Sequence, residues 1–150
     1  MPPSALEERA GRQAHWQELT KSECFELLAA THLGRVAMVD DRGPIALPVN
    51  FILDRHMVVF RTGEGAKLDA ARCGAPVAFE VDGTDTATLT GWSVVVRGEI
   101  AEVTDPAELA RLRELPLYPC GPGAKGGYVR ILPASVTGRR VLVPDGTHAS

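Results

Sequence analysis

Residues 58–68 constrain the fold most, because an apolar run leads directly into a turn that contains two glycines. The run from Val58 to Phe60 is β-branched or aromatic and suits a strand. Gly63 and Gly65 allow backbone geometries that other residues resist, and helix-favouring residues follow. The sequence therefore predicts a strand, a glycine turn and the start of a helix in immediate succession.

Arg61, Thr62 and Lys67 are polar side chains of this segment. A helix start offers free N–H groups and a positive dipole end, and Arg and Lys are the cations that grip phosphate oxygens. The segment is therefore interpreted as a phosphate cradle. A hairpin-to-helix connection with solvated charges is an equally good account of these residues taken alone.

Composition limits the protein class. With 150 residues, 15 glycines and 11 prolines spread among short Val-rich runs, the chain suits one turn-rich β domain. A net charge of −3 without a basic stripe argues against a nucleic-acid binder. No stretch approaches the length of a membrane span or the apolar core of a signal peptide, so we expect a cytoplasmic protein without a membrane partner.

The three cysteines, Cys24, Cys73 and Cys120, are odd in number and lack C-x-x-C spacing. Neither a disulfide framework nor a zinc site is indicated. We expect reduced thiols, with Cys24 in the core. The four histidines are scattered without ligand spacing, so no metal site is expected.

The order of expected elements describes a mainly β domain. Thr20 and Glu23 fit a capping box that opens the first helix, and Gly34 is a candidate for its end. The expected elements are a flexible arm over residues 1–19, a helix over 20–34, strands over 35–40, 45–53, 57–62, 77–81, 89–103 and 127–143, short helices over 67–73 and 106–115, a loop over 115–127 and a flexible tail over 144–150.

Three residues in the strands stand out. Pro48 indicates an edge or an interrupted ladder. Asn50 is polar in an apolar strand, and it either satisfies neighbouring backbone groups or faces a ligand. Glu80 is interpreted as solvent-facing, with an inward carboxylate paired to an arginine as the alternative.

An ordered series of motifs resembles the pyridoxamine 5′-phosphate oxidase-like, FMN-binding split-barrel family, in particular its small nitroimidazole-reductase-like bacterial branch. The series is Pro48-Val49-Asn50-Phe51, then Phe60-Arg61-Thr62 with Lys67, then Gly91-Trp92-Ser93-Val94-Val95-Val96-Arg97-Gly98. The resemblance implies a six-stranded antiparallel split barrel over residues 20–143. It also implies a homodimer with one FMN at each of two interface sites.

The resemblance implies specific cofactor contacts. The phosphate contacts fall on Arg61, Thr62 and Lys67, the strand with Asn50 lies against the flavin ring, and Ser93 presents a hydroxyl. Trp92 is expected to pack, because adjacent strand residues point to opposite faces. The full set of expected cofactor-binding residues is Pro48, Val49, Asn50, Phe60, Arg61, Thr62, Lys67, Leu68, Trp92 and Ser93.

The chain also departs from the family pattern. After Arg130-Ile131-Leu132-Pro133 the acidic and aromatic residues of true pyridoxamine phosphate oxidases are absent, and Cys120 follows Pro119 where relatives of the small branch have tryptophan. We therefore expect a flavin-dependent oxidoreductase that takes electrons from a nicotinamide donor and reduces a small acceptor. The alternatives are a deazaflavin-dependent reductase on the same fold and a non-catalytic protein that stores or senses flavin or haem.

Overall fold

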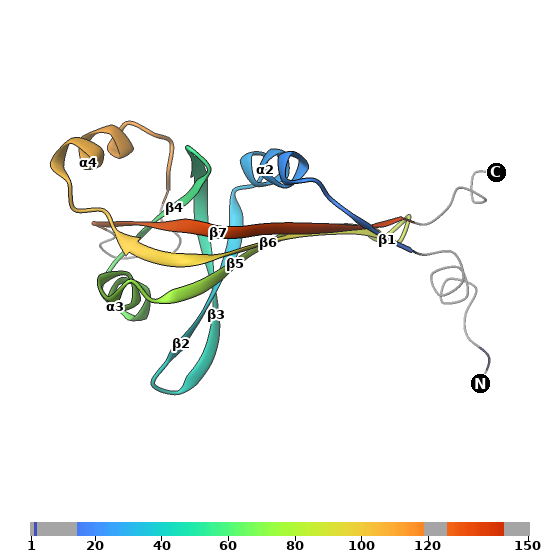
Figure 1. Ribbon diagram of the computed structural model, residues 1–150, viewed down its shortest axis with the longest axis horizontal. Coiled ribbons are helices and arrows are strands. Elements are labelled where there is room, and N and C mark those ends of the chain that lie inside the picture. The colour runs from blue at the N-terminus through green and yellow to red at the C-terminus, as the bar shows by residue number, and fades with distance from the viewer. Residues whose placement is uncertain (1, 3–14, 119–125, 143–150) are drawn as a thin grey trace.

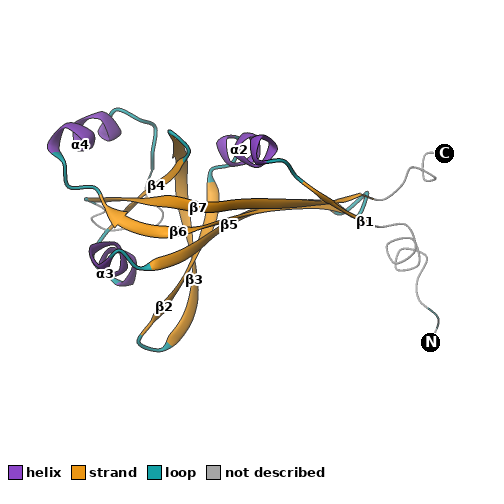
Figure 2. Cartoon of the chain, in the orientation of Figure 1, coloured by secondary structure: helices purple, strands orange, loops and turns teal. Residues whose placement is uncertain are grey.

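The computed structural model describes residues 2, 15–118 and 126–142, which form a strand-rich molecule with three helices (Figures 1 and 2). The elements are β1 (His15–Glu18), α2 (Lys21–Ala29), β2 (Leu33–Asp40), β3 (Gly43–Asp54), β4 (Met57–Thr62), α3 (Ala66–Cys73), β5 (Pro76–Asp85), β6 (Thr90–Glu102), α4 (Pro106–Arg113) and β7 (Gly127–Leu142).

The strands form one antiparallel sheet in the order β1-β7-β4-β3-β2-β5-β6, and β6 also pairs with β7. This last pairing closes six strands, β2 to β7, into a barrel. The predicted six-stranded split barrel is therefore confirmed, and β1 adds a seventh strand on the outside of β7. In Figure 1, α2 and α4 lie above β7, whereas α3 lies below it.

A β-bulge divides β7 into two halves. Gly98 of β6 pairs with Pro133 and Arg97 pairs with Ser135, so Ala134 has no partner in this ladder. Gly98 is required there, because an added Cβ would lie 2.0 Å from the carbonyl oxygen of Leu132. An extra residue reverses the alternation of side chains along a strand. The side chains of β7 that point into the barrel therefore have odd residue numbers before the bulge and even residue numbers after it.

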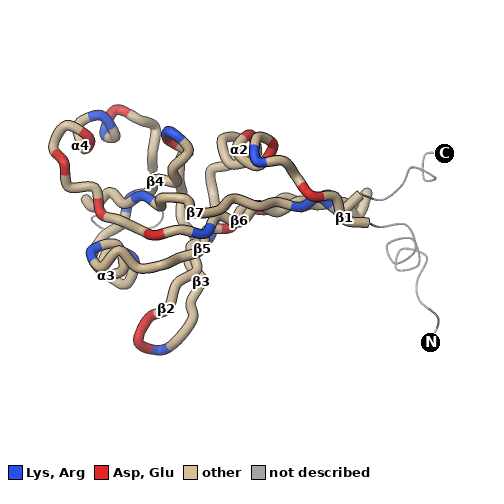
Figure 3. Tube along the Cα trace, viewed as in Figure 1, with Lys and Arg blue, Asp and Glu red and all other residues tan. Residues whose placement is uncertain are grey.

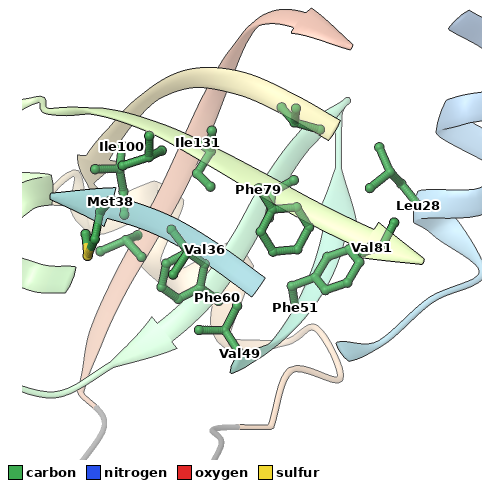
Figure 4. Packing of buried hydrophobic residues seen from close by; sticks show 14 of the residues in the cluster. Leu28, Val36, Met38, Val49, Phe51, Phe60, Phe79, Val81, Ile100 and Ile131 are labelled. Carbon is green, nitrogen blue, oxygen red and sulfur yellow. The ribbon is translucent and has the colours of Figure 1, made fainter. Parts of the chain in front are cut away.

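The barrel interior is filled by aliphatic side chains around aromatic rings (Figure 4). Phe51, Phe60 and Phe79 are at most 1% exposed. The rings of Phe51 and Phe79 meet edge to face with centroids 4.7 Å apart, a geometry that aromatic pairs prefer. Alternating apolar residues of all six barrel strands therefore build the core.

Helix α2 begins as the sequence predicts but ends earlier. The Glu23 N–H donates to Thr20 Oγ1 at 3.1 Å, and the Thr20 N–H donates to Glu23 Oε1 at 2.9 Å. The helix ends at Ala29, so the prediction that Gly34 ends it was wrong. Gly34 belongs to β2, where an added Cβ would lie 2.3 Å from the Phe79 ring. Close packing, and not helix termination, requires this glycine.

A second apolar cluster lies outside the barrel, beneath α4. It consists of Val59, Val103, Leu112, Leu117 and Tyr128. Asp105 caps α4 by accepting a hydrogen bond from the Glu108 N–H, and a proline occupies the first turn. Apolar residues of α4 therefore cover one patch of the outer barrel surface.

Strand β3 changes partners along its length. Residues 43–50 pair with β2, whereas Phe51 to Asp54 pair with β4. Over residues 43–50, no strand in the described part of the chain pairs with the other edge of β3. The Phe51 N–H donates to the His32 carbonyl at 2.9 Å, so odd-numbered N–H groups of β3 point toward β2. Pro48 therefore lies at an open edge of the sheet, one of the two positions predicted for it.

The chain ends differ in part from expectation. His15 to Glu18, expected within a flexible arm, form β1 and pair with β7 from Leu142 to Arg139. Four exposed residues give no apolar pattern, which is why the sequence did not indicate this strand. Residues 3–14, the expected tail over 144–150 and Cys120 in the 115–127 loop lie outside the described residues. Cys24 is buried and Cys73 exposed, both as free thiols.

Candidate functional site

The predicted cradle is built by the end of β4, a short turn and the first turn of α3. Gly65 occupies the N-cap of α3 with φ of 143° and supplies no side-chain cap. A Cβ at Gly65 would meet nothing within 4 Å, so the backbone angle, and not crowding, requires glycine. The N–H groups at the start of α3 thus have no capping side chain at this N-cap, and such a helix start suits an anion.

Charged residues of both signs lie near this helix start, and Asp69 is the acidic residue of its first turn. Figure 3 marks basic and acidic residues along the whole chain. Lys67 is in the first turn of α3 and is partly exposed. Glu64, an acidic residue of the turn, is engaged elsewhere, because Arg72 at the far end of α3 lies 3.2 Å from its carboxylate. Arg72 also lies 3.3 Å from Glu102. These ion pairs draw the acidic group toward the far end of the helix.

Arg61 projects from the outer face of β4 beside Tyr128. The two residues are cross-strand partners, and the guanidinium carbon lies 5.5 Å from the centre of the Tyr128 ring. Tyr128 is 7% exposed and belongs to the cluster beneath α4. A buried aromatic ring therefore supports the cation that the sequence assigns to phosphate.

Four of the expected cofactor residues turn their side chains into the barrel. Thr62 is 3% exposed, and its hydroxyl donates to the Gly63 carbonyl at 3.1 Å. Val49, Phe60 and Leu68 also belong to the barrel core. Any contact that these four residues make with a ligand must therefore come mainly from their backbones, and their roles in binding stay predictions.

Pro48 and Asn50 face outward, like Arg61. Their neighbours Val49 and Phe51 are buried in the core, so strand alternation directs the even-numbered residues of β3 to the outer face. Pro48 is exposed and Asn50 is partly exposed. Because the β3–β4 ladder begins at Phe51 and Phe60, the next residues along, Asn50 and Arg61, lie near each other on one surface.

Trp92 and Ser93 point to opposite faces of β6. Trp92 lies on the inner side and covers Gly83, where an added Cβ would be 2.5 Å from the indole nitrogen. Ser93 faces outward and lines a cavity of 430 Å³ with Arg97, Thr137 and Arg139. The preference for Trp92 as a packing residue agrees with this placement.

The structure does not bring Ser93 to the cradle within one chain. Arg61 pairs with Tyr128 of β7, whereas Ser93 pairs with Arg139, eleven residues farther along the same strand. At about 3.3 Å per residue, this separation is roughly 35 Å. The expected site residues therefore fall into two groups, one around the cradle and one on β6.

The group on β6 belongs to a long hollow on the outer face of the sheet. A cavity of 820 Å³ adjoins the Ser93 cavity and shares Val95 and Arg97 with it. Its lining includes the exposed apolar residues Val39 and Leu132, which are 75% and 45% exposed. We call these two adjoining cavities the outer-face trough. The trough is apolar over much of its length, with arginines toward one end.

An acidic pair lies beside the trough. Arg35 of β2 is 3.4 Å from both Glu80 and Asp82 of β5. Burial raises the pKa of Glu80 to about 7, the nearby Asp82 adds to this, and Arg35 opposes it. Glu80 thus faces outward, as predicted, yet it also pairs with an arginine, as the alternative proposed.

Sequence reasoning missed the ion pairs that hold α4. Arg111 donates to both carboxylate oxygens of Asp54, at 3.0 and 2.8 Å, and also to Glu108 at 2.8 Å. The Arg111 hydrogen bonds lower the pKa of Asp54. An acidic residue in a hairpin turn gave no signal of this contact, because its partner is 57 positions away.

No metal-binding group of three or more His, Cys, Asp or Glu residues occurs among the described residues. Likewise, none of the helices that the structure describes is both long and apolar enough to cross a membrane.

Comparison with known proteins identifies relatives along most of the chain. The uncharacterised protein Rv0080 of Mycobacterium tuberculosis is 38% identical over 135 residues, which cover 87% of this chain and 88% of that protein. The solved FAD binding protein from Mycobacterium smegmatis is 37% identical with a TM-score of 0.69, covering 83% of this chain and 97% of that one. An FAD-binding protein from Mesorhizobium loti is 25% identical with a TM-score of 0.71 and the same coverage.

These solved relatives are named for a flavin, which confirms the expected flavin-binding family at a coarse level; the name in both cases is FAD and not FMN. The sequence profile described as pyridoxamine 5′-phosphate oxidase matches residues 20–140. This match spans most of the chain, from the start of α2 to Arg140 near the end of β7. The chain therefore belongs to the pyridoxamine 5′-phosphate oxidase family.

Proposed function

We propose that this protein is a homodimeric flavin-dependent oxidoreductase whose cradle holds the phosphate next to the flavin ribityl chain. The observation that carries the proposal is the α3 start, where Gly65 leaves backbone N–H groups without a side-chain cap beside Arg61 and Lys67. This donor set fits a phosphate ester. FMN and FAD both carry that phosphate, so the cradle serves either nucleotide. We propose FMN as the cofactor. FAD is the alternative, because two solved relatives are named as FAD-binding proteins.

The dimer is proposed because the expected site is divided within one chain. The roughly 35 Å between Arg61 and Ser93 along β7 exceeds the length of an FMN molecule. A two-fold arrangement would bring the cradle of one copy to the β6 face of the other, and this is the commonest symmetry of homo-oligomers. The outer-face trough, with Val39 and Leu132 exposed, supplies apolar surface for the second copy.

When bound, the flavin supplies the electron-transfer chemistry, whereas the protein supplies binding, orientation and electrostatics. Arg61, Lys67 and the α3 N–H groups bind the phosphate. Asn50 offers an amide and Ser93 a hydroxyl to the polar edge of the ring. Because no side-chain acid or base is needed, the site suits electron transfer from a nicotinamide donor to a small acceptor such as a quinone, a nitro compound or oxygen.

The proposal is tested on the protein as purified from its host. Absorption spectroscopy and mass spectrometry of the released small molecule should identify a flavin, and anaerobic NADH or NADPH should then reduce it rapidly. A bound flavin that neither donor reduces would indicate a storage or sensing protein. Release of a deazaflavin or haem, or failure of the purified protein to bind added FMN or FAD, would contradict the proposed cofactor.

We do not propose that this chain oxidises pyridoxamine 5′-phosphate, the reaction for which its family is named. A pyridoxamine phosphate oxidase must bind the phosphate of its substrate as well as that of the flavin, which requires a second cationic cluster. Arg97 and Arg139 line one cavity outside the cradle, but the proposal assigns that cavity, with Ser93, to the flavin ring. The acidic and aromatic residues of true pyridoxamine phosphate oxidases are also absent after Pro133. The flavin-loaded protein should therefore form no pyridoxal 5′-phosphate; turnover near about 10 per second, the typical enzyme value, would overturn this.

A further inference from the structure

Tyr128 lies at the contact between the cradle and the cluster beneath α4. On one side, the Arg61 guanidinium stands 5.5 Å from the ring centre. On the other, the ring packs with Val59, Val103 and Leu112. The Tyr128 carbonyl also accepts a hydrogen bond from the Val103 N–H at 2.8 Å. Both the backbone and the ring of Tyr128 are therefore held in place.

The support behind the ring is itself held in place. Leu112 is 1% exposed and is the α4 residue of the buried cluster. Its neighbour Arg111 joins α4 to Asp54 at the end of β3 by two hydrogen bonds of 3.0 and 2.8 Å. A helix tied to the β3–β4 hairpin thus presses an apolar side chain against the cluster that contains Tyr128. The position of the ring depends on contacts from three parts of the chain.

We infer that Tyr128 is a positioning residue that holds the Arg61 guanidinium at the cradle and thereby favours ligands that carry a phosphate. An arginine side chain loses rotamer freedom when it is fixed, which costs free energy. A cation over an aromatic face is attracted to the ring, which contributes free energy in return. The ring therefore offsets much of this ordering cost before a ligand arrives. This inference rests on the proposed role of Arg61 as a phosphate ligand.

The test compares FMN with riboflavin, because riboflavin has the same ring and side chain but no phosphate. Tyr128→Leu removes the aromatic face, whereas Tyr128→Phe keeps it and removes only the hydroxyl. We expect the Leu variant to bind FMN between about 3- and 30-fold more weakly with riboflavin affinity unchanged. The Phe variant should bind both ligands within about twofold of the parent protein. Titration of flavin fluorescence in the full-length protein measures both affinities.

A double-mutant cycle with Arg61→Ala separates the possible failures. If Arg61→Ala lowers FMN and riboflavin affinity equally, the cradle itself is wrong. If Arg61→Ala weakens FMN selectively but Tyr128→Leu does not, the positioning role is wrong. In the Arg61→Ala background, Tyr128→Leu should cause no further loss of FMN affinity.

Loss of the ring also removes packing, so stability is measured alongside affinity. A purely structural role would lower the unfolding midpoint and weaken both ligands together. Should the Leu variant fail to fold, Tyr128→Met provides a second side chain without a ring. Selective loss of FMN affinity in a folded Met variant supports the inference, and an unchanged ratio of FMN to riboflavin affinity overturns it.

Discussion

Arg111 grips both carboxylate oxygens of Asp54, at 3.0 and 2.8 Å, and so ties α4 to the turn between β3 and β4. The Asp54 side chain is 12% exposed and that of Arg111 is 31% exposed. Such charge-assisted bidentate pairs are among the stronger hydrogen bonds of proteins. Because Asp54 is mostly shielded from water, the loss of its partner leaves a poorly solvated charge.

We expect Arg111→Met to lower the free energy of unfolding by about 1–3 kcal/mol at neutral pH. The pKa of Asp54 is lowered in the folded state by this arginine, so the stabilisation is present above the ordinary pKa of 3.8 and is lost as the pH falls through the folded value. Urea titrations at neutral pH and near pH 3 measure the difference. Arg113→Met, at an exposed position of the same helix, is the matched control and should have little effect.

A second pH dependence arises at Glu80. Its pKa is raised from 4.5 to about 7, first by burial and then by Asp82. The folded protein therefore binds this proton more tightly than the unfolded chain does, and the associated stability declines as the pH rises from about 4.5 to about 7. Glu80→Gln should flatten this part of the stability profile, whereas Glu99→Gln at an exposed position of β6 should not. Parallel profiles for the parent and Glu80→Gln would contradict the assignment.

The proposed cradle predicts that the protein distinguishes FMN from riboflavin. Arg61→Ala and Lys67→Ala should each weaken FMN by about 1.5–3 kcal/mol, the value of a hydrogen bond to a charged group. Riboflavin should bind nearly as it does to the parent protein. Calorimetry with both ligands measures the effect, and Arg42→Ala at the exposed β2–β3 turn serves as the control. Equal losses for the two ligands would exclude a phosphate contact at these residues.

The proposed dimer should have a mass of about 32 kDa, twice the 16.0 kDa chain. Val39 is 75% exposed, so Val39→Glu should leave the single chain folded while placing a charge in the trough. We expect this variant to sediment as a monomer and to lose flavin, although its cradle is intact. Val39→Thr, similar in shape but uncharged, should remain a dimer. A monomeric parent protein that retains its flavin would refute the shared site.

Local signals predicted most elements, because capping and strand alternation are encoded in neighbouring residues. The Thr20–Glu23 capping box is an example. Gly34 was misassigned because its reason is distant: the ring of Phe79 crosses it on the adjacent strand. β1 escaped detection because its four exposed residues leave no apolar pattern.

The succession of strand, glycine turn and helix was predictable, but the directions of its side chains were not. Strand alternation sends Arg61 outward and Thr62 into the barrel, and their role in binding phosphate stays a prediction. Tyr128 could not be connected with Arg61 in advance, since the β4–β7 register is set by barrel closure. The separation of Ser93 from the cradle likewise depends on how β6 and β4 meet different parts of β7.

The edge of β3 over residues 43–50 bears on how the protein avoids aggregation. An unpaired strand edge can recruit strands from other molecules. Odd-numbered N–H groups of β3 point toward β2, so the even-numbered positions face the open edge. Two of these positions, Pro44 and Pro48, have no N–H to donate. The edge thus lacks a continuous row of donors, and Pro48 discourages sheet extension whether or not it also contacts a flavin.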